Sequence, residues 1–93
     1  MKIRIISNFL IPGLEGEGIL IEDGSTVRQL LDNISDLLGG SFTFFEFGRD
    51  TLDPDDWEVD VNGKALDGYK IGPETVLEAN DIVAIRLLTY SGG

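Results

Sequence analysis

The chain has 93 residues, with 17 aspartates and glutamates against 7 lysines and arginines, and it contains neither cysteine nor histidine. This length accommodates one domain, and the two missing residue types exclude disulfide scaffolds, cysteine–histidine zinc sites, thiol nucleophiles and Ser-His-Asp triads. The formal net charge of -10 argues against nucleic acid and anionic membranes as partners, because neutralising phosphate requires lysine and arginine.

The remaining composition is typical of a folded, soluble protein. Apolar residues make up 42% of the chain, which is above the level at which acidic chains stay disordered. No apolar run reaches the roughly 20 residues of a membrane span. The first residues, Met1 to Asn8, are interrupted by charges and followed by Pro12-Gly13, which is unlike a signal peptide. We therefore expect a cytoplasmic location.

Residues 1–23 have the pattern of a β-hairpin. The segment Lys2 to Asn8 begins by alternating charged with β-branched side chains, and this period of two is that of a strand. Pro12-Gly13 and Gly16 to Gly18 mark a turn, and Ile19 to Glu22 then forms a short second strand.

The clearest local signal predicts a helix over about residues 26–38. Thr26 and Gln29 have the spacing of a capping box, and Gly39-Gly40 provides the left-handed backbone that ends a helix. Apolar side chains recur between them at the spacing of one helical face. They are Val27, Leu30, Leu31, Ile34, Leu37 and Leu38. We expect this face to form the centre of the core.

The segment 41–60 is aromatic and then acidic. It begins with four phenylalanines, at positions 42, 44, 45 and 47. From Glu46 to Asp60 the sequence then contains seven carboxylates and a single cation, Arg49, which gives a local net charge of -6. A calcium site or a hydrolytic carboxylate pair would need ligand spacing or a cleft that this stretch does not indicate. We predict a solvated acidic loop with no metal site, in which Asp53-Pro54 opens a helical turn. The acidic residues considered are Asp50, Asp53, Asp55, Asp56 and Glu58.

The last third of the chain predicts a second hairpin, a loop and a central strand. Trp57 to Val61 reads as a strand, and the Asn62-Gly63 turn leads into Lys64-Ala65-Leu66. Tyr69 to Ala79 is a loop holding a short turn. Ile82 to Leu88 is almost continuously apolar, which indicates a strand in the middle of a sheet, buried on at least one face.

The chain end is the candidate functional element. After Arg86 the sequence Leu87-Leu88-Thr89-Tyr90-Ser91-Gly92-Gly93 carries no charged side chain and finishes in two glycines. A frayed terminus is the plain explanation for such an ending. A functional role is the alternative, because two terminal glycines seldom arise by chance.

The order of these features resembles the ubiquitin-like β-grasp, and more closely its prokaryotic sulfur carriers. These are the small subunit of molybdopterin synthase and the thiamine-pathway sulfur carrier (MoaD/ThiS type). The resemblance is carried by Lys2-Ile3-Arg4-Ile5-Ile6, Gly24-Ser25-Thr26-Val27-Arg28-Gln29-Leu30-Leu31, Val61-Asn62-Gly63, Asn80-Asp81-Ile82-Val83-Ala84-Ile85 and Gly92-Gly93. It implies an α+β fold with a mixed four- to five-stranded sheet packed on one main helix, a domain at 1–88, and a flexible projecting tail at 89–93.

Three departures from the family pattern bear on the branch. The tail has Leu88-Thr89-Tyr90-Ser91 where the molybdopterin branch commonly has a proline-containing stretch, and Asn80 stands for the usual glycine before Asp81. Asparagine also enters the left-handed region, so that second change is tolerable. Residues 41–60 are longer and more acidic than in the compact thiamine carriers, which favours the molybdopterin branch.

The resemblance implies a carrier protein with no catalytic activity of its own. A partner enzyme would adenylate the terminal carboxylate of Gly93, next to Gly92, and a sulfur donor would convert it to a thiocarboxylate. The isolated chain would bind no cofactor; ATP and Mg²⁺ would belong to the adenylating enzyme. The sulfur would pass to a molybdopterin synthase large subunit or, in the thiamine alternative, to a thiazole synthase.

Docking is expected on the sheet face that points away from the helix. In a β-grasp the first and last strands are neighbours, so Ile3, Ile5, Val83 and Ile85 would face the helix. The candidate partner-binding residues are Arg4, Ile6, Arg86 and Leu88, joined by Tyr90 and Ser91 of the tail. A mixed arginine–apolar patch suits an interface, although an ordinary exposed sheet face has the same composition. Two other functions stay open: a modifier conjugated to lysines through Gly93, and an interaction module whose Gly-Gly has no role.

Overall fold

The computed structural model describes residues 1–9, 11–14, 18–40, 44 and 57–88, and these form an α+β fold with a single helix. In chain order the elements are β1 (Lys2–Ser7), β2 (Gly18–Leu20), α1 (Val27–Leu37), β3 (Trp57–Val61), β4 (Lys64–Ala65) and β5 (Ile82–Leu87). Two short 3₁₀ turns, Leu66–Gly68 and Gly72–Glu74, lie between β4 and β5. Residues 41–43 and 45–56, which hold most of the predicted acidic segment and its Asp53-Pro54 turn, lie outside the described residues, as does the tail at 89–93. The end of the acidic segment, residues 57–60, belongs to β3.

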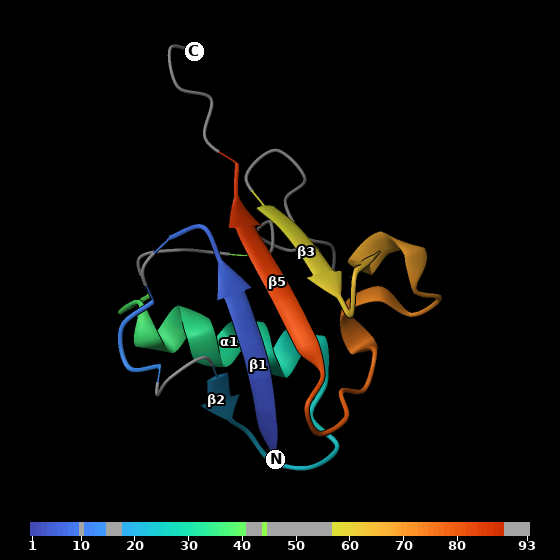
Figure 1. The fold of residues 1–93 in the computed structure, drawn as a ribbon, viewed down its shortest axis with the longest axis horizontal. Helices are drawn as coiled ribbons and strands as arrows, with labels where there is room; N and C mark the ends of the chain where they lie inside the picture. Colours follow the sequence, from blue (N-terminus) through green and yellow to red (C-terminus); the bar gives the residue numbers. More distant parts are fainter. Residues whose placement is uncertain (10, 15–17, 41–43, 45–56, 89–93) are drawn as a thin grey trace.

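The five strands form one mixed sheet in the order β2-β1-β5-β3-β4 (Figure 1). β1 and β5 are parallel, whereas β1 with β2, β3 with β5 and β3 with β4 are antiparallel. Both predicted hairpins are therefore confirmed, and the last strand is central, as its apolar run indicates. Asn62 and Gly63 make the β3–β4 turn with φ of 52° and 83°, the left-handed backbone that this turn requires.

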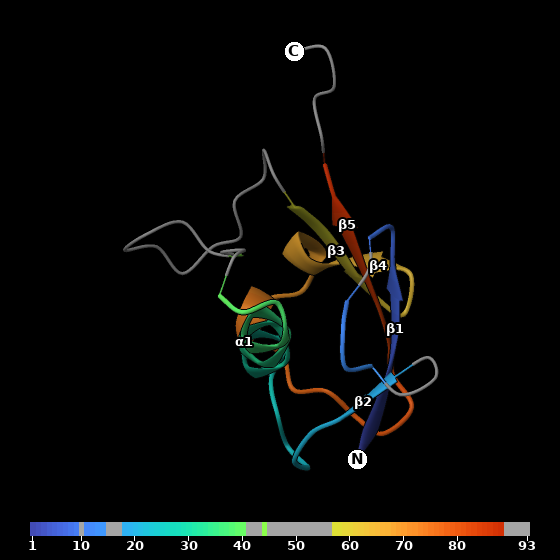
Figure 2. The same ribbon diagram turned by 90° about the vertical axis from the view of Figure 1, so that its left-hand side faces the viewer.

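The helix α1 lies across one face of the sheet (Figure 2), and its predicted start is confirmed. The Thr26 hydroxyl accepts a hydrogen bond from the Gln29 N–H at 3.3 Å, and the Gln29 side chain accepts one from the Thr26 N–H at 2.8 Å. At the other end, Gly39 and Gly40 have φ of 70° and 74°. Their left-handed backbone ends the helix as predicted.

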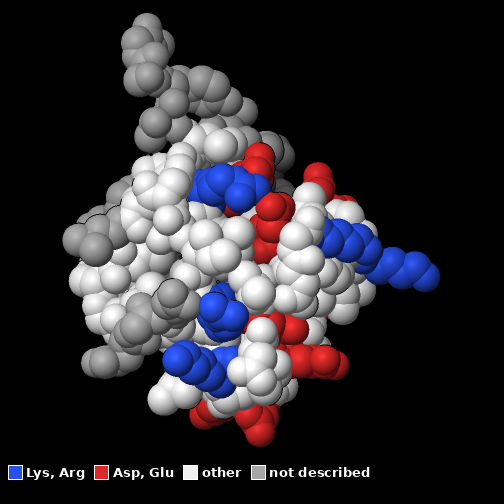
Figure 3. Space-filling model, viewed as in Figure 1, with Lys and Arg blue, Asp and Glu red and all other residues white. Residues whose placement is uncertain are grey.

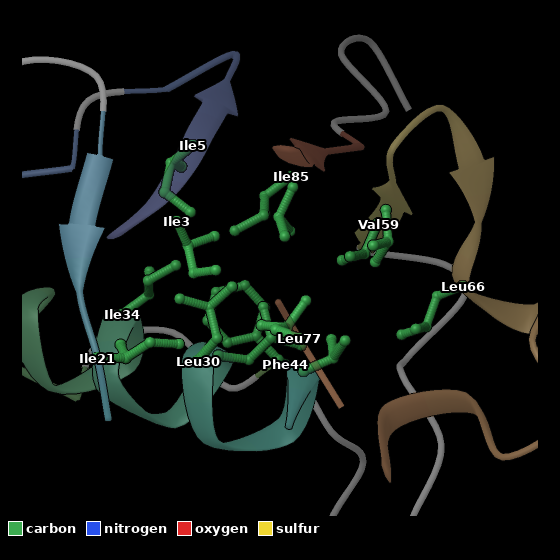
Figure 4. Close-up of a cluster of buried hydrophobic side chains, with 14 of the residues drawn as sticks. Ile3, Ile5, Ile21, Leu30, Ile34, Phe44, Val59, Leu66, Leu77 and Ile85 are labelled. Carbon is green, nitrogen blue, oxygen red and sulfur yellow. The ribbon is translucent and has the colours of Figure 1, made fainter. Parts of the chain in front are cut away.

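The core lies between α1 and the inner face of the sheet (Figure 4). Leu30 and Ile34 of α1 belong to the same buried cluster as Ile3 of β1 and Ile85 of β5, and all four are fully buried (Figure 4). The expectation that all six apolar helix residues are buried is wrong at the C-terminal end. Leu37 is 37% exposed and lies beside Gly13, and Leu38 is only partly buried. The helical period identifies the buried face, but it does not show where the packing against the sheet ends.

Candidate docking face on the sheet

The outer face of the sheet, which points away from α1, is set by strand alternation. In β1, Ile3 and Ile5 are buried while Lys2, Arg4 and Ile6 are exposed. In β5 the alternation repeats: Val83 and Ile85 are buried, whereas the residues between and after them are half-buried. The four residues expected to face the helix do so. The outer residues of β5 are Ile82, Ala84 and Arg86.

The parallel register joins these outer residues into one surface. Arg4 pairs with Ile82, and Ile6 pairs with Ala84. Lys2 pairs on its other side with Leu20 of β2. Ile6 and Leu20 are 59% and 77% exposed, so apolar side chains reach solvent between the cations. We call Lys2, Arg4, Ile6, Leu20, Ile82, Ala84 and Arg86 the outer patch.

Charges on this face are separated by strand. Figure 3 shows Lys and Arg side chains in a column over β1 and β5, interrupted by uncharged residues, with Asp and Glu beside them toward β3. Lys2, Arg4 and Arg86 are three of the seven cations of a chain whose formal net charge is -10. The outer patch therefore collects positive charge on a protein that is strongly acidic as a whole.

Arg86 is held by two carboxylates of β3. Its Nε donates to Glu58 at 2.8 Å, and its Nη2 bonds both Glu58 and Asp60, the latter at 2.6 Å. Glu58 is the direct cross-strand neighbour of Arg86. The hydrogen bonds to Asp60 and then to Glu58 raise the pKa of Arg86 above its usual value, so the guanidinium keeps its charge. The two carboxylates neutralise the patch where the last strand ends, a pairing that the sequence interpretation missed.

The other predicted site residues follow β5 or lie beyond the described part of the chain. Leu88 comes directly after β5 and is half-buried. Tyr90, Ser91, Gly92 and Gly93 lie outside the described residues. The structure therefore brings Arg4, Ile6 and Arg86 onto one face of the adjacent strands β1 and β5. The second of these strands, β5, leads into Leu88 and the candidate tail.

The described residues contain no group of three acidic side chains placed to hold a metal ion. Glu58, one of the five carboxylates considered in the acidic segment, is paired with Arg86. The other four, Asp50, Asp53, Asp55 and Asp56, lie outside the described residues.

No protein-family model, curated protein sequence or solved structure matches this chain. Within the described segments, no helix has the length and apolar character needed to cross a membrane. The topology, the outer patch and the sequence that follows β5 are therefore the features that bear on function.

Proposed function

We propose that this chain is a ubiquitin-like β-grasp sulfur carrier of the molybdopterin synthase small-subunit type. The observation that supports it most directly is the parallel pairing of the first and last strands at the centre of a mixed sheet, with one helix on the opposite face. This arrangement is compatible with a β-grasp, the fold that the sequence resemblance implies. The last strand, β5, runs straight into the uncharged sequence that finishes in Gly92-Gly93.

The proposed chemistry uses the carboxyl group of Gly93. In the active site of a partner enzyme, a carboxylate oxygen of Gly93 attacks the α-phosphorus of ATP and pyrophosphate leaves, giving an acyl-adenylate. A hydrosulfide ion supplied by the donor then attacks the acyl carbon; AMP leaves with the oxygen that joined it to the carbonyl, a proton is released, and one oxygen of Gly93 is thereby replaced by sulfur. A free carboxylate is a poor electrophile, and the adenylate provides the leaving group. ATP and Mg²⁺ belong to the partner, which must supply the cationic groups that bind phosphate.

The outer patch is proposed as the surface that docks on the adenylating enzyme. Its most exposed apolar members, Ile6 and Leu20, supply area that docking would desolvate, and the surrounding cations suit a polar rim. Because Arg86 is already paired with Glu58 and Asp60, docking there would not bury an unpaired charge, which is costly. The tail that follows Leu88 in the sequence would then enter the nucleotide site while the acidic body stays outside.

Intact-mass spectrometry tests the proposal. The purified chain, whose mass must first show that it ends at Gly93, is incubated with ATP, Mg²⁺, the adenylating enzyme encoded in the same genome and its sulfur donor. We expect a mass gain equal to the exchange of one oxygen for sulfur, located at Gly93 by fragmentation. A variant lacking Gly93 is the matched control and should gain nothing.

Two outcomes would overturn the proposal. An adduct joining Gly93 to lysine side chains would identify a protein modifier. The mass of the chain could also stay unchanged with an enzyme that binds it, while the variant lacking Gly93 keeps its function. That result would identify an interaction module in which Gly92-Gly93 has no role. The receiving pathway follows from mixing the sulfur-loaded chain with a molybdopterin synthase large subunit or a thiazole synthase and observing which one removes the sulfur.

A further inference from the structure

The side chain of Asn8 bonds the backbone of Leu87, the last residue of β5. Its Nδ2 donates to the Leu87 carbonyl at 3.1 Å, and its Oδ1 accepts from the Leu87 N–H at 2.9 Å. A carboxamide offers the same donor and acceptor pair as a peptide group. Asn8, an exposed residue 79 positions away in sequence, thus acts on β5 as a further residue of the neighbouring strand would.

This contact begins where the backbone pairing of β1 and β5 stops. The last registered pair of the two strands is Ser7 with Ile85. After Ser7, the chain turns: the Ser7 hydroxyl donates to the Phe9 carbonyl at 2.7 Å, and the Phe9 ring meets Trp57 edge-on at 5.6 Å between centroids. In an extended strand every second residue directs its N–H and C=O to the same side. Leu87 is therefore the next β5 residue that needs partners on this side, and Asn8 supplies both.

On its other side, β5 reaches the end of β3 at the same residue. The first residue of β3, Trp57, pairs with Leu87. Leu87 is therefore the position at which β5 leaves both of its neighbours, and Leu88 is already outside the strand. Whatever holds the Leu87 backbone determines where the chain leaves the sheet and in which direction it starts.

We propose that Asn8 is a positioning residue that fixes the exit of the C-terminal segment from the sheet. The inference rests on the proposed function, because it concerns how Gly93 is delivered to the adenylating enzyme. Both polar groups of the Leu87 backbone are held, so the strand end from which the chain continues into Leu88 is fixed. A segment prepared in this way loses less conformational freedom when it enters the active site.

The first arm of the test needs no partner. Amide hydrogen exchange of Leu87 is measured by NMR in the full chain and in Asn8→Ala. Because the net free energy of a single hydrogen bond is modest, we expect the Leu87 amide to exchange about 3- to 10-fold faster in the variant. Asn33→Ala, at an exposed asparagine of α1, is the matched control and should leave Leu87 unchanged. Unchanged exchange in Asn8→Ala would show that Asn8 does not hold the strand end.

The second arm measures delivery, with the adenylating enzyme that activates the wild-type chain and an ATP–pyrophosphate exchange assay. We expect Asn8→Ala to lower kcat/KM for the carrier by about 3- to 10-fold through KM, since ordering the segment precedes the chemical step. Asn8→Gln keeps both hydrogen-bonding groups and should recover part of the lost kcat/KM. The control Asn33→Ala should show no loss of kcat/KM. The unfolding midpoint of Asn8→Ala should stay close to that of the wild type, which a purely structural role would not predict.

The possible failures are distinguishable. Faster exchange at Leu87 with unchanged kinetics would refute the positioning role and leave the carrier function standing. If no adenylating enzyme activates the wild-type chain, the proposed function falls and the delivery role falls with it. The exchange arm would then still decide whether Asn8 holds Leu87.

Discussion

Replacing Ile6 and Leu30 separately by alanine should have opposite consequences, although each change removes the same number of carbon atoms. Leu30 is fully buried between α1 and the sheet, whereas Ile6 is 59% exposed on the outer patch. Leu30→Ala leaves a cavity and should cost about 2–5 kcal/mol of unfolding free energy. For Ile6→Ala, about 0.8 kcal/mol per methylene applies only to the buried minority of the side chain, so we expect about 1 kcal/mol or less.

Urea unfolding measures both losses with one signal. Trp57 is the single tryptophan and is 4% exposed, so its fluorescence reports opening of the core. A loss of about 2–5 kcal/mol is a large part of the roughly 5–15 kcal/mol that stabilises a domain, and the midpoint of Leu30→Ala should fall accordingly. Equal losses in the two variants would refute the burial argument and mean that Ile6 is covered in the folded chain.

The same Ile6→Ala variant tests the outer patch as a docking surface. Truncating an apolar residue at the centre of an interface typically costs more than about 1 kcal/mol of binding, or at least about 5-fold in Kd. We expect that loss for the adenylating enzyme, measured by titration calorimetry. Ile71→Ala is the matched control, because Ile71 is 60% exposed and lies outside the strands. Equal affinity of the Ile6 variant and the wild type would place docking elsewhere.

Substitutions at three further positions examine the fold and its charges. Thr26→Ala removes the capping box and should cost about 1 kcal/mol in urea unfolding, while Thr26→Ser should retain most of it; no loss would contradict the cap geometry. Gly63→Ala meets nothing within 4 Å but has φ of +83°, so backbone strain alone should cost about 1–2 kcal/mol, and a neutral result would argue against the left-handed turn. Arg86→Gln leaves Glu58 and Asp60 without their cation, and its stability deficit in urea should shrink at high salt as the repulsion is screened. A deficit independent of salt would indicate a packing role for Arg86 instead.

The elements of this fold are predictable from local sequence because each of them carries its own signal. Alternation in Lys2 to Asn8, the capping box at Thr26 and the Asn62-Gly63 turn each depend on a few adjacent residues, and all three are present in the structure. The central place of Ile82–Leu87 follows from its apolar run, since only a strand between neighbours has that much surface to bury. Where burial depends on how far the packing extends, as at Leu37, the local pattern is wrong.

The candidate site likewise contains features that local sequence predicts and features that depend on tertiary contacts. Alternation within β1 and β5 is enough to place Arg4, Ile6 and Arg86 on one face once the two strands are assumed to be neighbours. No local pattern predicts that Arg86 binds Glu58, because that pair depends on the register of β3 against β5.

By itself, the sequence determined the fold class and which side chains lie on each face of the sheet. It specified one acidic domain without cysteine or histidine, a capped helix, two hairpins, an apolar last strand and an uncharged run to Gly92-Gly93. These properties depend on composition or on neighbours along the chain. Tertiary structure decided which distant groups meet: the carboxylates that hold Arg86, and the Asn8 amide that holds Leu87. A contact across 79 residues exists only because parallel pairing of β1 with β5 brings the ends of both strands to the same edge of the sheet.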